Sequence, residues 1–392
     1  MVELARAHSE ARRVAERVED DLPRLLDDLE RWVSIDTPAS AISSCDQLAE
    51  DLAATLVGYG LQAELVDAGE TQGRYVHATL KGAGTSRVAL LGHHDTVFPA
   101  GTASARPMAC TDGRLLGPGV ADMKGGLAVG AHVARALALG PRPFGTLEFV
   151  SASDEESRPR VLQTIERLDG FDAVLCLECG RADGSVVSAR KGARWFRVSA
   201  AGRAAHAGVD PGAGRNAVAA LCREAVRLRQ LNRARDGMTL EVTEFAADAG
   251  INTVPAHASI TVDLRAQTST DLEWAMSEAR SWGDHEGIVI SEEDLGGPPP
   301  LKRTSAIATL ASAATELGRS LGHVFGETTT GGVSDASWTA WHGIPTLDGL
   351  GPVGALDHTP EEYIEAASLA PRAGVVGGLV AAVSAGLLDS SR

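Results

Sequence analysis

The sequence predicts an α/β protein in which a mixed-sheet main domain is interrupted by a smaller, inserted α+β domain. Three observations lead to this prediction. The chain has 392 residues, which exceeds one ordinary compact core and favours two domains or a large insertion. Three short apolar runs in its first half each end in acidic or histidine residues, as strands of open α/β sheets do at a ligand site. Between about residues 190 and 298 the pattern changes to the order β-α-β-β-α-β.

The first part of the main domain, residues 1–189, is expected to begin with a helix. Apolar residues between positions 22 and 33 recur there at three- and four-residue steps. The elements expected next are one or two strands within 60–79, a buried strand at 87–91, a small-residue helix at 125–139, and strands at 145–151 and 173–177. Continuous apolar runs of this length are typical of strands buried on both faces of a sheet.

The inserted domain is expected to span residues 190–298. Its strands are predicted at 195–200, 238–245, 257–264 and 287–291, and its helices at 216–231 and 271–282. This order is that of a ferredoxin-like sandwich. The Gly-Gly-Pro-Pro-Pro segment at 296–300 is a natural linker, and residues 299–392 are assigned to the second part of the main domain.

Composition excludes several classes of partner. The chain carries 36 Lys and Arg against 52 Asp and Glu, a formal charge of −16. This charge repels phosphate backbones and anionic lipid surfaces, so we expect no nucleic-acid or membrane partner. The apolar stretch at 373–388 is short for a membrane span and rich in Gly and Ala, which predicts a buried terminal helix. The charged N-terminal residues lack the apolar segment of a signal peptide, so we expect a cytoplasmic protein.

The five cysteines do not form a disulfide framework, because they are few and odd in number. Cys176 and Cys179 form a CxxC pair, but the sequence has no second pair that would complete a zinc knuckle. We expect both to be inert strand cysteines.

Four short segments hold most of the polar residues that are informative about chemistry. They are 92–97 (Gly-His-His-Asp-Thr-Val), 117–126 around Asp122, 154–156 (Asp-Glu-Glu) and the surroundings of His358. Each has a plainer interpretation alone: a polar strand end, a glycine-rich turn, an acidic surface turn and a structural histidine. Together, two histidines and several carboxylates at strand ends suit borderline divalent ions such as Zn²⁺.

Residue spacing adds one detail to this interpretation. At a strand end, residues two apart face the same way, so His93 and Asp95 share a side while His94 points elsewhere. A carboxylate beside a metal-binding imidazole commonly holds its orientation. A carboxylate shared by two ions, with two further ligands for each, would make a two-metal hydrolytic site.

Nine segments carry a resemblance to a known family. They are 92–97, 117–126, 154–156, Glu178, 205–208 (Ala-His-Ala-Gly), 252–255 (Asn-Thr-Val-Pro), 263–265 (Asp-Leu-Arg), 331–335 (Gly-Gly-Val-Ser-Asp) and 358–360 (His-Thr-Pro). In this order the sequence resembles the glutamate carboxypeptidase, acetylornithine deacetylase and succinyl-diaminopimelate desuccinylase family of dizinc amidohydrolases. Its motifs are most similar to those of the glutamate carboxypeptidase branch. The resemblance implies a mixed-sheet zinc-peptidase catalytic domain with an inserted ferredoxin-like dimerisation (lid) domain.

The resemblance also implies a ligand set for two divalent metal ions, with Zn²⁺ as first choice and Co²⁺ or Mn²⁺ as alternatives. Asp122 would bridge both ions, Glu156 and His358 would complete one site, and His93 and Glu178 the other. Family members often have a cis peptide after the bridging aspartate, here between Asp122 and Met123.

Catalytic and substrate-binding roles follow from the same resemblance. Glu155 would be the general base, and Asp95 would orient the His93 side of the site. His206 would stabilise the oxyanion from the inserted domain of a partner subunit, which implies a homodimer.

The substrate contacts implied are Arg265 as a carboxylate clamp, Asn252 as its assistant, and Gly331 and Gly332 in the pocket lining. A guanidinium pairs bidentately with a carboxylate, although an exposed strand arginine is the plainer interpretation of Arg265. Residues 157–160 (Ser-Arg-Pro-Arg) depart from the Gly/Ser-rich run that is usual in the family.

The resemblance implies hydrolysis of an amide next to a free carboxylate, in a small molecule or short peptide. Release of a C-terminal amino acid is the first choice, and deacylation of an N-acyl amino acid is the alternative. A serine hydrolase built on Ser334 is a competing hypothesis, because residues 332–336 approach the GxSxG pattern. Residues 328–332 before it are not expected to form a strand. A non-catalytic homologue that keeps the fold is the last alternative.

Overall fold

The computed structural model describes residues 2–158 and 160–389. Its chain divides into two compact units. One comprises Met1–Ala189, Arg303–Thr329 and Ser334–Arg392, and the other comprises Arg190–Lys302 and Thr330–Val333. The second unit is therefore an insertion in the sequence of the first.

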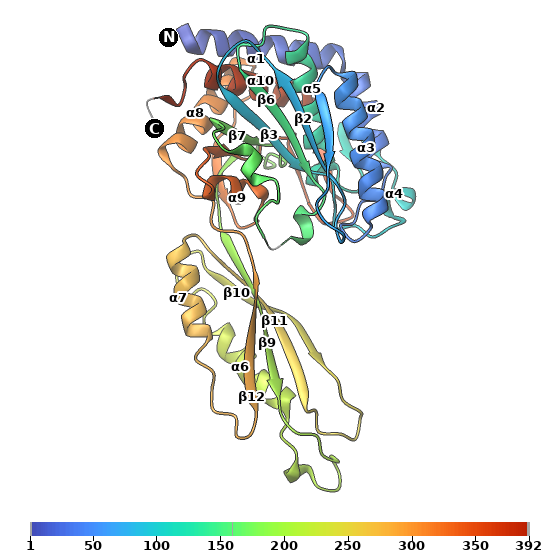
Figure 1. Cartoon of the computed structure of the whole chain (residues 1–392), viewed down its shortest axis with the longest axis vertical. Coiled ribbons are helices and arrows are strands. Elements are labelled where there is room, and N and C mark those ends of the chain that lie inside the picture. Colours follow the sequence, from blue (N-terminus) through green and yellow to red (C-terminus); the bar gives the residue numbers. More distant parts are fainter. Residues whose placement is uncertain (1, 159, 390–392) are drawn as a thin grey trace. The chain divides into compact units, whose positions relative to one another are not determined.

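A six-stranded mixed sheet forms the centre of the first unit (Figure 1). Its strands, in spatial order, are β1 (Gln62–Val66), β2 (Tyr75–Lys81), β6 (Thr146–Ala152), β3 (Arg87–His93), β7 (Ala173–Cys176) and β14 (Thr346–Leu347). The last four run parallel, whereas β1 and β2 pair antiparallel at one edge. The carboxyl ends of β3, β6 and β7 consequently meet at one edge of the sheet.

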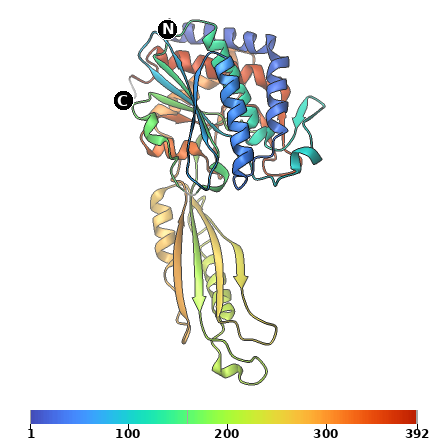
Figure 2. The same cartoon turned by 45° about the vertical axis from the view of Figure 1, so that its right-hand side comes forward.

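Helices lie on both sides of this sheet (Figure 2). The helices of the first unit are α1 (Val2–Asp20), α2 (Leu22–Val33), α3 (Ile42–Gly58), α4 (Thr102–Ala105), α5 (Gly125–Ala138), α8 (Ser305–Ser320), α9 (Asp335–Trp341) and α10 (Leu369–Ser384). Side-chain caps fix two of the helix starts. The Thr304 and Ser334 hydroxyls accept hydrogen bonds from the N–H groups of Ile307 and Ala336, respectively. Each predicted helix and strand of residues 22–177 is present, with shifts of a few residues at the ends.

Helix α10 shows why the C-terminal stretch is rich in glycine. A Cβ at Gly377 would approach the Val14 side chain of α1 to 2.7 Å, and one at Gly378 would approach Ala11 to 2.9 Å. The missing side chains let the two helices pack closely. Segment 366–384 is long and apolar enough to cross a membrane by composition, yet 83% of its most apolar window is buried in the protein. The prediction of a buried terminal helix is confirmed.

Short elements complete the first unit. A small sheet has the order β15 (Gly354–Ala355), β16 (Tyr363–Glu365), β5 (Arg114–Leu116) and β4 (Ala109–Thr111). A separate two-stranded sheet consists of β8 (Val186–Arg190) and β13 (Glu327–Thr330). Strand β13 corrects the expectation that 328–332 contains no strand: its threonines favour extended backbone, and β8 supplies a partner. The helical turns are η1 (Val120–Lys124), η2 (Glu155–Ser157), η3 (Ile165–Leu168), η4 (Pro211–Ala213), which belongs to the second unit, and η5 (Ala366–Ser368).

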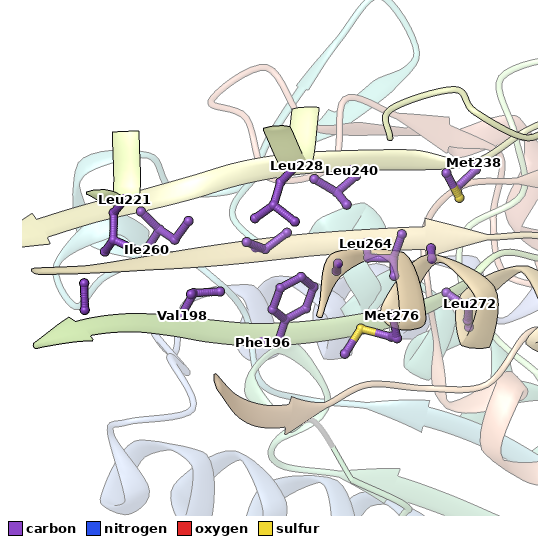
Figure 3. Packing of buried hydrophobic residues seen from close by; sticks show 14 of the residues in the cluster. Phe196, Val198, Leu221, Leu228, Met238, Leu240, Ile260, Leu264, Leu272 and Met276 are labelled. Atoms are coloured by element: carbon purple, nitrogen blue, oxygen red, sulfur yellow. The ribbon is translucent and has the colours of Figure 1, made fainter. Parts of the chain in front are cut away.

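The second unit has one four-stranded antiparallel sheet and two helices. The sheet order is β10 (Thr239–Ala247), β11 (His257–Ala266), β9 (Gly192–Ala201) and β12 (Val289–Gly296). Helices α6 (Ala217–Arg229) and α7 (Ser269–Ala279) lie between strands in the sequence, so the predicted β-α-β-β-α-β order is observed. Alternate residues of β11 are buried, and they meet Phe196, Leu221 and Met276 in the core (Figure 3). A dimerisation or lid role for this unit stays a prediction.

Candidate metal centre

Two groups of potential metal ligands in the first unit share the Asp122 carboxylate. In the first group, His93 Nε2 lies 3.0 Å from Asp122 Oδ1 and 3.6 Å from Glu178 Oε1. In the second, His358 Nε2 lies 3.0 Å from Asp122 Oδ2 and 3.3 Å from Glu156 Oε2. Within each group, three ligand atoms lie within 4.8 Å of one another. The five predicted ligands are thus brought together in the predicted pairing.

The sheet topology explains this convergence. His93 is the last residue of β3, Glu156 lies in η2 just after β6, and Glu178 follows β7. These three strands are parallel neighbours, so residues at their carboxyl ends are adjacent. Asp122 lies in the η1 turn before α5, and His358 lies between β15 and β16. The peptide bond between Asp122 and Met123 is cis, as predicted.

Glu362, which is not among the predicted site residues, holds the Asp122 turn. Its Oε1 accepts hydrogen bonds from the N–H groups of Ala121 at 2.7 Å and Asp122 at 3.0 Å, and its Oε2 accepts one from Gly119 at 3.1 Å. Glu362 is fully buried. Burial raises the pKa of its carboxyl group to about 7, against the lowering effect of these three donors.

Asp95 connects His93 with the acidic turn. Asp95 Oδ1 lies 3.3 Å from His93 Nδ1. The Asp95 carboxylate also accepts backbone hydrogen bonds from Glu155 at 3.1 Å and Glu156 at 3.0 Å. His94 points elsewhere, toward the Ser151 hydroxyl at 2.9 Å, as predicted.

Burial dominates the acid–base behaviour of the three glutamates. It raises the pKa of Glu155 well above its usual range, that of Glu156 to about 7, and that of Glu178 as well. Nearby carboxylates contribute in the same direction.

The two histidines respond to the carboxylates beside them. Burial lowers the pKa of His93, but hydrogen bonds with Asp122 and other carboxylates raise it well above its usual range. Hydrogen bonds with Asp122 and Glu156 raise the pKa of His358 to about 11. Burial acts to raise the pKa of Asp122, but the two imidazoles outweigh it and hold that pKa well below its usual range.

The donor set fits divalent cations. Three carboxylates crowd around two imidazoles, and such a cluster is costly unless positive charge neutralises it. Glu156 Oε1 is buried and has no hydrogen-bond partner, so it has a lone pair free for an ion. Imidazole nitrogen and carboxylate oxygen are ligands of Zn²⁺ and related borderline ions.

Comparison with known proteins decides the family. The model of peptidase family M20/M25/M40 matches residues 89–382, a range that contains all five ligand candidates. The chain belongs to this peptidase family. It is a metal-dependent hydrolase of the peptidase and amidohydrolase type.

Its relatives carry several activities in their names. Carboxypeptidase G2 from a Pseudomonas species is 26% identical over 377 residues, covering 94% of this chain and 91% of the relative. A succinyl-diaminopimelate desuccinylase from Methylibium petroleiphilum is 26% identical, covering 85% and 95%. The solved structure of a Staphylococcus aureus tripeptidase has a TM-score of 0.74 at 21% identity, covering 92% and 98%. That structure supports the fold alone.

The peptidase-family departure at residues 157–160 has a structural explanation, although Pro159 lies outside the described residues. The Arg158 Nε donates to Asp154 Oδ1 at 2.9 Å, and its Nη2 donates to Asp335 Oδ1 at 2.6 Å. The Tyr75 hydroxyl also donates to Asp154, at 2.5 Å. Arg158 and both carboxylates are buried, so this arginine neutralises two acids beside the η2 turn.

Ser334 has structural partners in this peptidase. Its hydroxyl donates to Asp348 at 2.6 Å and accepts from the Ala336 N–H at 3.3 Å as the cap of α9. Cys176 and Cys179 are buried and form no disulfide, and burial raises the pKa of the Cys179 thiol well above its usual range. Cys176 is a strand cysteine as expected, whereas Cys179 lies beyond the end of β7.

The remaining predicted residues belong to the second unit. His206 is exposed; its Nδ1 accepts from the Gly208 N–H at 3.2 Å, and the Asn252 carbonyl accepts from the Ala207 N–H at 2.8 Å. The two predicted loops, around 206 and around 252, are therefore neighbours.

The Arg265 side chain is held by hydrogen bonds within its own unit. Its Nε lies 3.0 Å from Asp263 Oδ1, and its Nη1 donates to the Gly331 carbonyl at 3.0 Å. The neighbouring Gly332 carbonyl accepts from Arg190 at 3.2 Å. Arg265 and the Gly331–Gly332 loop are brought together, and their substrate-binding roles stay predictions.

Proposed function

We propose that this protein hydrolyses an amide bond next to a free carboxylate, and that it releases the C-terminal amino acid of a short peptide. The observation that carries the proposal is the Asp122 carboxylate shared between two ligand groups, with Glu155 beside them. The carboxypeptidase relative, which covers nearly the whole chain, supports the choice of substrate class.

The proposed cofactor is a pair of divalent ions, with Zn²⁺ as first choice and Co²⁺ or Mn²⁺ as alternatives. His93, Asp122 and Glu178 would hold one ion, and Asp122, Glu156 and His358 the other. Ions bound there would lower the pKa of a water molecule toward neutrality and polarise the scissile carbonyl.

Glu155 is the proposed general base. Its carboxylate would accept a proton from the attacking water and pass it to the leaving nitrogen. Burial increases the proton affinity of this carboxylate, which suits a group that must first take and then return a proton. Asp95 would position Glu155 through its backbone N–H while also orienting the His93 ring.

The second unit would supply the remaining groups. We propose that His206 stabilises the oxyanion in the site of a partner subunit, so that the working enzyme is a homodimer. Arg265 would bind the substrate carboxylate, with Asn252 and the Gly331–Gly332 loop beside it. We also propose that the protein is cytoplasmic.

Deacylation of an N-acyl amino acid is the second candidate. It is favoured by the desuccinylase relatives, one of which aligns over 377 residues. Both candidates cleave an amide next to a free carboxylate, and they differ only in what lies on the acyl side of that amide.

Amino acid release from a substrate panel tests the proposal. The panel would contain peptides ending in Glu or Ala, N-acyl-glutamate, N-acyl-ornithine, N-succinyl-diaminopimelate and a neutral N-acyl amino acid, each with and without a chelator. We expect chelator-sensitive release from the peptides. Release from acylated amino acids alone would favour the deacylase, and chelator-insensitive release would contradict the metal mechanism. A metal-loaded protein that cleaves nothing would favour the non-catalytic homologue.

A further inference from the structure

Arg372 is a buried cation without an acidic partner. It lies in the first turn of α10, and its side chain is 2% exposed. Within residues 2–158 and 160–389, no carboxylate oxygen lies within 4.0 Å of its guanidinium nitrogens; the buried Arg158, in contrast, has two such partners. The Nη2 group donates to the Gly184 carbonyl, while the buried Nη1 group has no hydrogen-bond partner.

Unpaired burial of a guanidinium is unfavourable, since the charge leaves water without compensation. Burial lowers the pKa of Arg372 to about 10, although the nearby Cys179 thiol and Asp183 carboxylate act to raise it. Within the described residues, the Phe325 ring is the only aromatic ring stacked against this cation, with its centroid 4.6 Å from Cζ. An aromatic face supplies less negative potential than a carboxylate, and the Asp183 carboxylate acts on Arg372 without a direct ion pair, so the Nη1 group remains open to an anionic partner.

The Arg372 side chain also lines a cavity of about 200 Å³. Its apolar wall is formed by Val324, Phe325, Val353 and Val375, and His323 also lines the cavity. Ser368 contributes to the wall, but its hydroxyl already donates to the Glu365 carbonyl and accepts from the Val353 N–H. Asp183 also lines the cavity, and its oxygens accept hydrogen bonds from the Ser185 N–H and hydroxyl.

We propose that this cavity binds a small monocarboxylate with a short aliphatic tail. The carboxylate would pair with the Arg372 guanidinium, and the tail would contact the valine and phenylalanine walls. A phosphate dianion fits less well, because it requires several donors and would lie in a cavity that Asp183 also lines. The proposed ligand therefore carries one negative charge and a short apolar chain.

The position of the cavity gives this site a structural consequence. A Cβ on Gly180 would come within 2.4 Å of Arg372 Nη2, so the guanidinium packs directly on the backbone two residues after Glu178. The same backbone pairs with the chain that leads to His358, through Gly180 N–H to Pro352 O at 2.9 Å and Gly354 N–H to Gly180 O at 3.1 Å. A bound anion would stabilise both segments, so ligand binding should raise the melting temperature.

Titration of the metal-loaded protein with potassium butyrate tests the proposal, with potassium chloride at equal ionic strength as reference. The test variant is Val324→Trp, which places an indole at the cavity wall from a residue that is 79% exposed. Its matched control is Val57→Trp on α3, where the valine is 55% exposed and distant in sequence from the cavity. Arg372→Met removes the charge directly and is informative if circular dichroism shows that it folds.

We expect a saturable rise in melting temperature with butyrate in wild type and Val57→Trp, and an affinity at least about tenfold weaker in Val324→Trp. Butyrate could also bind at the metal centre, where it would inhibit hydrolysis. Inhibition of that kind should be the same in wild type and Val324→Trp, which distinguishes it from binding in the cavity. An identical response in all three proteins would overturn the site. A response to chloride equal to that with butyrate would overturn the ligand class, and a folded Arg372→Met with wild-type affinity would overturn the role of the arginine.

Discussion

The Asp95 carboxylate accepts a hydrogen bond from the backbone N–H of Glu155, at 3.1 Å. The same carboxylate lies 3.3 Å from His93 Nδ1. One buried side chain therefore touches both a candidate metal ligand and the backbone of the proposed base. The orientation of the metal centre and the position of the base are linked through this residue.

Replacement of Asp95 tests this link. Asp95→Asn keeps the size of the side chain but removes its charge and one acceptor. We expect kcat to fall by about 10- to 100-fold, together with weaker metal binding, because outer partners of metal ligands have effects of that size. Steady-state kinetics and metal content measure both changes. Asp27→Asn on the exposed side of α2 is the control, and wild-type kinetics for Asp95→Asn would contradict the link.

Replacements of the adjacent Glu155 and Glu156 are predicted to have different effects, one on catalysis and the other on metal binding. Glu155→Gln should lower kcat by about 10²- to 10⁴-fold, the usual range for a general base, while the protein retains both metals. Glu156→Gln should instead lose metal, because it removes the negative charge of a proposed ligand. Kinetics and elemental analysis of the two variants, made side by side, distinguish these effects. Equal metal loss in both would contradict the assignment of Glu155.

Glu362→Gln should destabilise the Asp122 turn. The carboxylate accepts three backbone N–H groups, and an amide cannot present two equivalent oxygen acceptors. A buried donor left unsatisfied costs about 1–3 kcal/mol, so we expect a loss of unfolding free energy in that range, with lower metal affinity. Denaturant unfolding of the metal-free protein measures the stability term. Unchanged stability and metal affinity would show that the carboxylate does not hold the turn.

Asp28 gives a pH-dependent prediction away from the metal centre. Burial acts to raise its pKa, but hydrogen bonds from His132, Tyr59 and Arg31 outweigh it and lower the pKa from 3.8 to about 2. Because the folded state favours the ionised form, this stabilisation is present above pH 4 and is lost as the pH falls through about 2.

The Asp28 shift corresponds to about 2 kcal/mol. Wild type should therefore exceed Asp28→Asn in unfolding free energy by at least this amount at pH 7, and the difference should narrow between pH 4 and pH 2. Denaturant titrations at several pH values measure this difference. A pH-independent difference would contradict the proposed ionisation.

Ser334→Ala should leave kcat unchanged and cost about 1 kcal/mol of stability, because the hydroxyl caps α9. The comparison combines a kinetic assay with thermal unfolding. Loss of activity in a folded Ser334→Ala protein, especially with chelator-insensitive wild type, would restore the serine hydrolase hypothesis.

The sequence predicted the central sheet well because its strands depend on local patterns, whereas the metal-ligand roles rest on the family resemblance and stay predictions. Buried parallel strands appear as continuous apolar runs; His93 is the last residue of one such strand, and Glu178 lies two residues after the end of another. Asp122 and His358 required the family resemblance, since neither directly follows a strand of the central sheet.

Other features depend on contacts that are distant in the sequence. The Glu362 carboxylate accepts hydrogen bonds from backbone N–H groups about 240 positions earlier in the sequence. The only sequence feature that could have indicated this role is its position as the second glutamate after His-Thr-Pro. In the sequence, Arg158 is only a departure from the family pattern. Its structural role depends on Asp335, which lies 177 residues later and beside it in the fold. Strand β13 was missed because its pairing with β8 is not visible in a run of threonines.

The sharing of Asp122 by two bound cations is the proposal on which the other roles at the metal centre depend. It is tested most directly by titrating Zn²⁺ into the metal-free protein in competition with a chromophoric chelator, for wild type and Glu178→Ala. We expect two tightly bound equivalents in wild type and one in Glu178→Ala, because the group of Asp122, Glu156 and His358 stays intact. A single equivalent in wild type, or two in Glu178→Ala with unchanged affinity, would contradict it.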